Sequence, residues 1–283
     1  MKKVIKKIVS DWLPPALLRG IKAILLPMRP AAYEFIGYKW PDTARKSGWH
    51  ANGVLQAREL AWRSYVRSLE GTHPLGIAEQ ALTSPSNVNT DVQSLYLSFA
   101  YSLGLACHNK LSITMLDWGG ANGNYYLLSK KLMPMVQFNY SSADLPLICE
   151  TGRKLLPEVS FCADDSWQKK SYDFVFSSSS LQYLENWRPI LKALIKSTDH
   201  YMYITRMPFV TGKSFVALQR VKEYNTEYLG WVLNRHDFIS FVEENGMQLV
   251  REFVNHPGPV IQGAPVQNIY MGFLFEKKYE NKL

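Results

Sequence analysis

The residues with the clearest capacity for chemistry lie between Asp117 and Gly123, where the sequence reads Asp-Trp-Gly-Gly-Ala-Asn-Gly. An apolar run beginning at Ile113 precedes the aspartate, and a helical pattern follows the last glycine. Glycines allow positive φ angles and let the backbone approach a ligand closely. The N-terminus of the helix adds free N–H groups and positive potential, which suit a carboxylate or a phosphate. The pattern predicts a ligand-binding loop, although an ordinary strand–turn–helix with a tight Gly-Gly turn would also produce it.

Two classes of ligand fit a loop of this kind. A dinucleotide site needs the spacing Gly-x-Gly-x-x-Gly to pass a pyrophosphate. The spacing here is Asp-x-Gly-Gly-x-x-Gly, which differs from that pattern. An acidic residue two positions before the first glycine suits a ligand with an ammonium group, and S-adenosylmethionine carries one together with its sulfonium. We therefore predict an S-adenosylmethionine site that contains Asp117, Gly119, Gly120 and Gly123.

Acidic residues also follow the next two apolar runs. Asp144 comes after the run Val136–Ser141, where a carboxylate can bind both hydroxyls of a ribose. It could also cap the helix that starts at Pro146, and the two roles are compatible. Asp164 and Asp165 follow a third short run, and either could accept a hydrogen bond from the adenine amine or be a solvated turn residue.

A fourth apolar run, Phe174–Ser177, leads into a serine-rich turn. Ligands of parallel sheets bind at the carboxyl ends of the strands. Ser180 and Gln182 are therefore predicted to contact the cofactor, and Tyr183 to lie where the methyl donor meets its acceptor. Packing in the core is an equally good interpretation of Tyr183.

Two further residues are candidates for the transfer itself. Methyl transfer from a sulfonium is an in-line displacement, so an enzyme mainly aligns the reactants and excludes water, and a hydroxyl acceptor benefits from a general base. Arg206 follows a fifth strand and suits a phosphate or carboxylate on the acceptor. His256 begins the Pro/Gly-rich loop 255–268, on the same predicted edge as the cofactor. The alternatives are an arginine in a structural ion pair and a histidine of an ordinary loop.

The elements that must position these residues are visible as a change of pattern near Ile113. From there, short apolar strands alternate with helices, which predicts a parallel sheet. The last two strands have no helix between them and are therefore expected to be antiparallel. A helix is predicted to start near the capping residue Asn234. The predicted strands are 113–117, 136–141, 174–177, 201–205, 248–253 and 270–276, and the predicted helices are 91–107, 125–132, 146–155, 187–195 and 237–244.

The N-terminal part has a different character. Residues 1–30 carry +6 of the net charge of +8, on two amphipathic stretches broken at Pro14-Pro15. This arm could bind an anionic membrane surface or pack on the protein's own core. Residues 33–50 are aromatic and could line a substrate pocket or form an irregular lid, and a helix is predicted over residues 54–70.

Composition excludes several other classes of protein. The chain has 47% apolar and 20% charged residues, which is typical of a globular protein. The near-neutral remainder of the chain argues against a nucleic-acid groove. The three cysteines, Cys107, Cys149 and Cys162, form no cluster with histidines, so we expect reduced thiols and no metal site. Charged residues interrupt every apolar stretch near the N-terminus, so no signal peptide or membrane span is predicted and a cytoplasmic protein is expected.

The ordered segments resemble the class I S-adenosylmethionine-dependent methyltransferases. They resemble more narrowly a methyltransferase family often encoded among genes for surface-polysaccharide or lipopolysaccharide synthesis. The resemblance runs from Phe35 to the C-terminus. It implies that Asp117, Gly119 and Gly123 hold the amino-acid end of the cofactor and that Asp144 holds the ribose. Ala121 departs from the family, where many relatives have glycine. The matching segments read DWGGANG, SADLP, YDFVFSSSSLQYL and YITRMPF.

These observations predict an α/β protein with a Rossmann-like, mostly parallel class I methyltransferase sheet, a C-terminal antiparallel β-hairpin and an N-terminal helical extension. The expected regions are a basic arm (1–30), a helical and aromatic cap (31–110) and the Rossmann-like domain (111–283). The expected activity is methylation of an oxygen on a small-molecule or glycan acceptor, near the inner face of a membrane. A catalytically silent binding module and a nicotinamide-dependent oxidoreductase are the alternatives. The sequence predicts no oligomeric state.

Overall fold

The computed structural model describes residues 31–42, 62–76, 90–221 and 226–278. Contacts divide the chain into Met1–Ala32 and Tyr33–Leu283, and the second unit contains the sheets. The predicted basic arm and the first part of the helix predicted over residues 54–70 lie outside the described residues. Residues 62–68, in the second part of that prediction, are helical.

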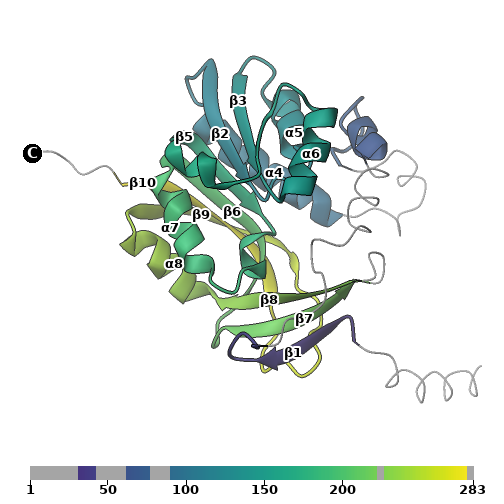
Figure 1. Cartoon of the computed structure of the whole chain (residues 1–283), viewed down its shortest axis with the longest axis vertical. Coiled ribbons are helices and arrows are strands. Elements are labelled where there is room, and N and C mark those ends of the chain that lie inside the picture. Colours follow the sequence, from purple (N-terminus) through teal and green to yellow (C-terminus); the bar gives the residue numbers. More distant parts are fainter. Residues whose placement is uncertain (1–30, 43–61, 77–89, 222–225, 279–283) are drawn as a thin grey trace, which may run out of the picture. The chain divides into compact units, whose positions relative to one another are not determined.

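A sheet built around parallel strands forms the centre of this unit (Figure 1). Its order is β4-β3-β2-β5-β6, and β10 and β9 continue it, with β10 antiparallel to both β6 and β9. The direction of winding reverses between β2 and β5, and ligands of open α/β sheets bind at such a switch point. The predicted Rossmann-like class with a C-terminal antiparallel pair is confirmed. The strands are β2 (Ser112–Trp118), β3 (Gln137–Ala143), β4 (Ser160–Cys162), β5 (Tyr172–Ser178), β6 (Thr198–Val210), β9 (Met247–Pro257) and β10 (Ile269–Lys277).

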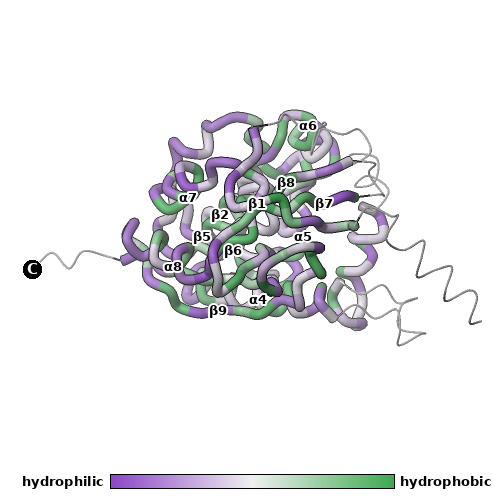
Figure 2. Tube along the Cα trace, turned by 90° about the horizontal axis from the view of Figure 1, so that it is seen from below, coloured by the Kyte–Doolittle hydropathy of each residue, from purple (hydrophilic) through white to green (hydrophobic). Residues whose placement is uncertain are grey.

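Helices cover both faces of the sheet because neighbouring strand residues point to opposite sides. Met115 packs in one core with α4, α5 and α6, whereas Leu116 packs in a second core with α7 and α8. Hydrophobic segments run through the middle of the unit and hydrophilic ones lie along its outside (Figure 2). No described helix combines the length and apolar character needed to cross a bilayer. The helices are α4 (Thr90–Ala106), α5 (Asn124–Leu132), α6 (Pro146–Leu155), α7 (Trp187–Lys196) and α8 (Arg235–Glu244).

Three antiparallel strands that the sequence did not predict extend the sheet beyond the end of β6. They are β1 (Tyr33–Gly37), β7 (Phe215–Val221) and β8 (Thr226–Asn234), in the order β1-β7-β8. The final residues of β6 pair in parallel with the end of β8. Residues 33–37, expected to belong to a helical and aromatic cap, thus form a strand of this group. In Figure 1 the three strands lie below the parallel strands and beside the carboxyl end of β6.

Candidate functional site at the switch point and the adjoining cavity

Asp117 is almost completely buried at the end of β2, with 1% of its surface exposed. Its carboxylate accepts a hydrogen bond of 2.6 Å from the Tyr140 hydroxyl. Burial raises the pKa of Asp117 to about 7, because a charge is costly away from water, and the Tyr140 hydrogen bond offsets part of that rise. A cationic ligand beside this carboxyl would therefore favour its ionised form.

The first two glycines of the loop are needed because other parts of the protein approach them closely. Gly119 has φ +74°, and a Cβ there would lie 2.0 Å from the Ser180 hydroxyl oxygen. A Cβ on Gly120 would lie 2.5 Å from the hydroxyl oxygen of Ser142 and 2.6 Å from the carboxyl carbon of Asp117. These glycines bring the ends of β2, β3 and β5 together at the switch point.

Gly123 has a different role in the structure. It precedes α5 with φ +82°, and a Cβ there would lie 2.8 Å from a methyl carbon of Leu156. This glycine lets the start of α5 pack against the segment after α6. Its predicted contact with the cofactor stays a prediction.

Asp144 joins the glycine loop to the end of β3. Its carboxylate accepts hydrogen bonds from the Ala121 N–H at 2.8 Å and the Leu145 N–H at 2.7 Å. Ala121 has φ +53°, a left-handed conformation that glycine adopts more easily. Asp144 is only partly buried, and a carboxylate has about four lone-pair sites, so it retains capacity for the hydroxyls of a ribose.

Four buried side-chain atoms around this edge have no hydrogen-bond partner among the described residues. They are the oxygens Asn122 Oδ1, Ser142 Oγ, Ser177 Oγ and Gln182 Oε1. Buried polar groups are normally paired, so such a group of orphaned oxygens favours a bound polar ligand. Two of them are carbonyl oxygens, which can only accept hydrogen bonds, as an ammonium group requires. Asn122 and Ser142 were not predicted, because no local pattern distinguishes them.

The turn after β5 brings the other predicted residues to the same edge. The Ser180 hydroxyl donates to the Ser178 carbonyl at 3.0 Å, and Gln182 Nε2 donates to the Ser179 hydroxyl at 3.0 Å. The Tyr183 hydroxyl donates to Gln219 Oε1 on β7 at 3.2 Å. Burial raises the pKa of Tyr183, which therefore stays protonated.

Asp164 and Asp165 lie farther along the edge, after β4. Asp164 caps a short 3₁₀ helix (Asp165–Lys169) and accepts from the Ser166 N–H at 3.1 Å. Hydrogen bonding to Ser166 lowers the pKa of Asp164. Both aspartates are exposed. Their contact with adenine stays a prediction.

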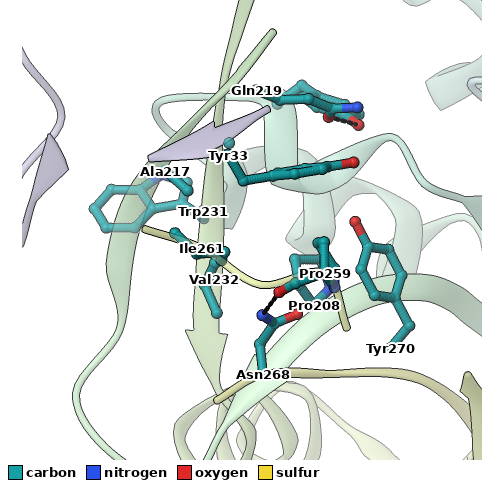
Figure 3. Close-up of a pocket in the computed structure, with 12 residues that line it drawn as sticks. Tyr33, Pro208, Ala217, Gln219, Trp231, Val232, Pro259, Ile261, Asn268 and Tyr270 are labelled. Atoms are coloured by element: carbon teal, nitrogen blue, oxygen red, sulfur yellow. Dashed lines mark hydrogen bonds between the residues drawn. The ribbon is translucent and has the colours of Figure 1, made fainter. Parts of the chain in front are cut away.

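A small cavity of about 20 Å³ lies between the parallel edge and the antiparallel strands (Figure 3). Tyr183 forms part of its wall, so the cavity adjoins the turn that carries Gln182. This volume holds about one water molecule, so a larger ligand would lie beside the cavity wall or require the wall to open. Figure 3 shows Asn268 bonded to the Pro259 carbonyl at the base. The wall consists of Tyr33, Tyr183, Pro208, Ala217, Gln219, Gly230, Trp231, Val232, Pro259, Ile261, Asn268 and Tyr270.

Arg206 lies at a bulge in β6, two residues before Pro208 in the cavity wall. It has φ +55°, and the register between β6 and β10 shifts at this point. Its backbone N–H donates to Asn255 Oδ1 at 3.2 Å, and its side chain is exposed. No carboxylate within the described part of the chain forms an ion pair with it. The alternative of a structural ion pair is therefore not seen.

His256 lies within β9 and not in the loop after it. Its ring stacks on Tyr270, with 4.5 Å between ring centroids and 19° between planes. Its Nδ1 lies 2.9 Å from the Pro257 carbonyl oxygen. Tyr270 lines the cavity and His256 does not. The predicted role of His256 as a base stays a prediction.

No group of three or more potential metal ligands occurs among the described residues. No protein-family profile matches the chain, and no curated protein sequence matches it.

Several solved structures are similar in shape. One is a magnesium protoporphyrin IX methyltransferase from Synechocystis PCC 6803 with bound SAM (12% identity, 80% of this chain and 98% of that chain, TM-score 0.46). Another is a 1,6-didemethyltoxoflavin-N1-methyltransferase from Burkholderia thailandensis (11% identity, 88% and 97%, TM-score 0.48). A third is a SAM-dependent methyltransferase from Methanosarcina mazei (14% identity, 61% and 97%, TM-score 0.48).

Proposed function

We propose that this chain is an S-adenosylmethionine-dependent methyltransferase whose cofactor site is the loop between β2 and α5. The observation that carries the proposal is the set of orphaned buried oxygens around the buried Asp117 carboxyl at the switch point. Oxygens that accept hydrogen bonds, next to a carboxyl with a pKa of about 7, suit a ligand with an ammonium group and a sulfonium. A pyrophosphate, which carries negative charge, would be repelled there.

The residues present fit the parts of this cofactor. Asp117, Asn122 and Gln182 offer oxygens to the ammonium group. Asp144, partly exposed beyond the glycine loop, has lone pairs for the ribose hydroxyls. When bound, S-adenosylmethionine supplies an electrophilic methyl group on its sulfonium. The chain's own part is to orient donor and acceptor and to exclude water.

The acceptor belongs next to Tyr183, on the side that adjoins the cavity wall. This tyrosine connects the two regions, because its turn also carries Gln182 and its hydroxyl bonds to Gln219 in the cavity wall. An oxygen of a sugar or glycan intermediate is the acceptor that the family resemblance implies. A site of action at the inner face of a membrane is part of the same hypothesis and depends on residues 1–30.

Isothermal titration calorimetry of the purified full chain with S-adenosylhomocysteine tests the proposal. We expect one binding site, weakened in Asp144→Ala and unchanged in Asp237→Ala, a control at an exposed aspartate on α8. Absence of binding to the native chain would favour the silent module. Binding of NADH in its place, seen as a change of its fluorescence, would favour the oxidoreductase.

A further inference from the structure

The bulge in β6 turns one cationic side chain toward the face that adjoins the cavity. Ile204 before the bulge and Met207 after it both pack in the core under α7 and α8. The inserted residue, Arg206, is left on the other face, together with Pro208 of the cavity wall. Bulges commonly redirect a side chain next to an active site. A left-handed φ of +55° at a non-glycine residue carries an energetic cost, which favours a functional reason for the geometry.

A buried donor without an acceptor lies beside the same bulge. Asn255 is 4% exposed, and its Oδ1 accepts from the Thr205 hydroxyl at 3.1 Å and from the Arg206 N–H. These two bonds fix the amide. Burial raises the pKa of Tyr203, and the nearby Asn255 side chain offsets part of that rise, but Asn255 Nδ2 makes no hydrogen bond among the described residues. An amide N–H₂ requires an oxygen with lone pairs. An exposed guanidinium and an orphaned amide donor at one bulge both call for an oxyanion.

The charge of the Arg206 guanidinium acts on the hydroxyls of several buried or partly buried tyrosines. Arg206 lowers the pKa of each, but burial raises the pKa by more, so the hydroxyls stay protonated at neutral pH and do not compete with an anion for the positive charge. The tyrosines are Tyr33, Tyr96, Tyr125, Tyr183 and Tyr270.

We propose that Arg206 and Asn255 bind a carboxylate or phosphate group of the methyl acceptor at the β6 bulge, next to the cavity wall formed by Pro208 and Tyr270. Planar carboxylates and phosphates are the groups that a guanidinium binds with two hydrogen bonds. This acceptor class deepens the proposed function and rests on it.

Saturation-transfer NMR on the full chain, with and without S-adenosylhomocysteine, tests the inference. The probes are D-glucuronate, α-D-glucose 1-phosphate and neutral D-glucose, which share one ring and differ in charge. We expect binding of one or both anionic probes and at least tenfold weaker binding of glucose. The carboxylate and phosphate probes distinguish the two sources of the anion.

Two variants assign the binding to the bulge. Arg206→Gln should weaken binding of the anionic probe about tenfold or more. Arg188→Gln, at an arginine on α7 that stacks over Trp187, should leave this binding unchanged. Asn255→Asp keeps an oxygen for Thr205 and for the Arg206 N–H but replaces the orphaned donor with a carboxylate oxygen. Asn255→Asp should therefore also weaken binding of the anionic probe.

The outcomes separate this inference from the proposed function. Equal binding of charged and neutral probes, no binding of either anion at 10 mM, or unchanged anion binding in Arg206→Gln would overturn the inference. Arg206→Gln should retain S-adenosylhomocysteine binding. If the native chain does not bind S-adenosylhomocysteine but binds the anion through Arg206, the methyltransferase proposal is wrong and the anion site still stands.

Discussion

The two regions of the site present opposite hydrogen-bonding character. At the switch point the unsatisfied groups are oxygens, around Asp117 and including those of Asn122 and Gln182. At the β6 bulge the available groups are donors, the Arg206 guanidinium and the Asn255 amide. The first region suits a cationic ligand and the second an anionic one. In the proposed function, the first region would hold the ammonium group of S-adenosylmethionine and the second an anionic group of the methyl acceptor.

The largest expected effect is at the switch point, whose unsatisfied groups accept hydrogen bonds and which we call the acceptor-rich region. Asp117→Ala removes the carboxylate that would pair with an ammonium group, and hydrogen bonds to charged groups contribute about 1.5–3 kcal/mol. We expect the affinity for S-adenosylhomocysteine, measured by calorimetry, to fall about 10- to 100-fold. Binding of the anionic probes at the bulge should be unchanged.

Tyr140→Phe is the control for that variant. It removes the hydroxyl that donates to Asp117 but keeps the carboxylate. Cofactor affinity should therefore change much less than in Asp117→Ala. Equal losses in the two variants would show that the Tyr140–Asp117 hydrogen bond, and not the carboxylate itself, supports cofactor binding, and the contrast between the regions would then disappear.

Gly119→Ala should destabilise the edge where β2 meets β5. The new Cβ would overlap the Ser180 hydroxyl at a φ of +74°. Gly246→Ala is a matched control, because Gly246 has φ +96° but no atom within 4 Å of its Cβ position. Thermal melts should show a loss of about 1 kcal/mol for Gly246→Ala, from backbone strain, and a larger loss for Gly119→Ala. Equal losses would mean that the approach of Ser180 to the loop is dispensable.

The pH dependence of cofactor affinity follows from the raised pKa of Asp117. Ammonium binding requires the ionised carboxylate, and a group with a pKa of about 7 is about tenfold more ionised at pH 8 than at pH 6. Affinity for S-adenosylhomocysteine should rise by about that factor over this range. Calorimetry at pH 6.5 in buffers of different ionisation enthalpy should detect a released proton, and a flat profile would contradict the assignment.

The same shift makes the stability of the free protein depend on pH with the opposite sign. The folded pKa of Asp117 lies above its unfolded value of 3.8, so the folded state binds more protons between about pH 4 and 7. Its contribution to the free energy of unfolding is greatest below pH 4 and is lost as the pH rises through 7. Denaturant titrations should show this loss in the native chain and not in Asp117→Asn.

The smallest expected effect concerns Ala121. Glycine at φ +53° removes the steric cost of a left-handed alanine, and the greater freedom of the unfolded chain offsets part of this gain. We expect Ala121→Gly to raise the free energy of unfolding by about 0.5 kcal/mol in denaturant titrations. Cofactor affinity should stay the same because the N–H that donates to Asp144 is retained. A lower stability would show that the loop needs the methyl group.

The acceptor-rich region was largely predictable from sequence, because its residues belong to consecutive strand–loop–helix segments. The runs before Asp117 and Asp144, and the helices after them, have clear local periodicity. What could not be predicted there is burial: Asn122 and Ser142 stand out only because their oxygens have no partner in the folded chain.

The region at the β6 bulge, whose available groups are hydrogen-bond donors, was not predictable in the same way, because it depends on pairing between distant segments. Tyr33 reaches the cavity only because β1 pairs with β7, where its partner is the distant residue Gln219. Arg220 on β7 bonds to Glu34 and Glu227 on its two neighbouring strands, a pattern of charges that is not visible before the strands are aligned. Arg206 was found from its position after a strand, but the bulge and its partner Asn255 were not.

A co-crystal structure with S-adenosylhomocysteine tests the central claim most directly. The account predicts the ligand across the loop between β2 and α5, with its ammonium group at Asp117, its ribose hydroxyls at Asp144, and its sulfur directed toward Tyr183. A glycine loop still closed by Ser180 and Ser142, with the ligand bound elsewhere or absent at saturating concentration, would contradict it.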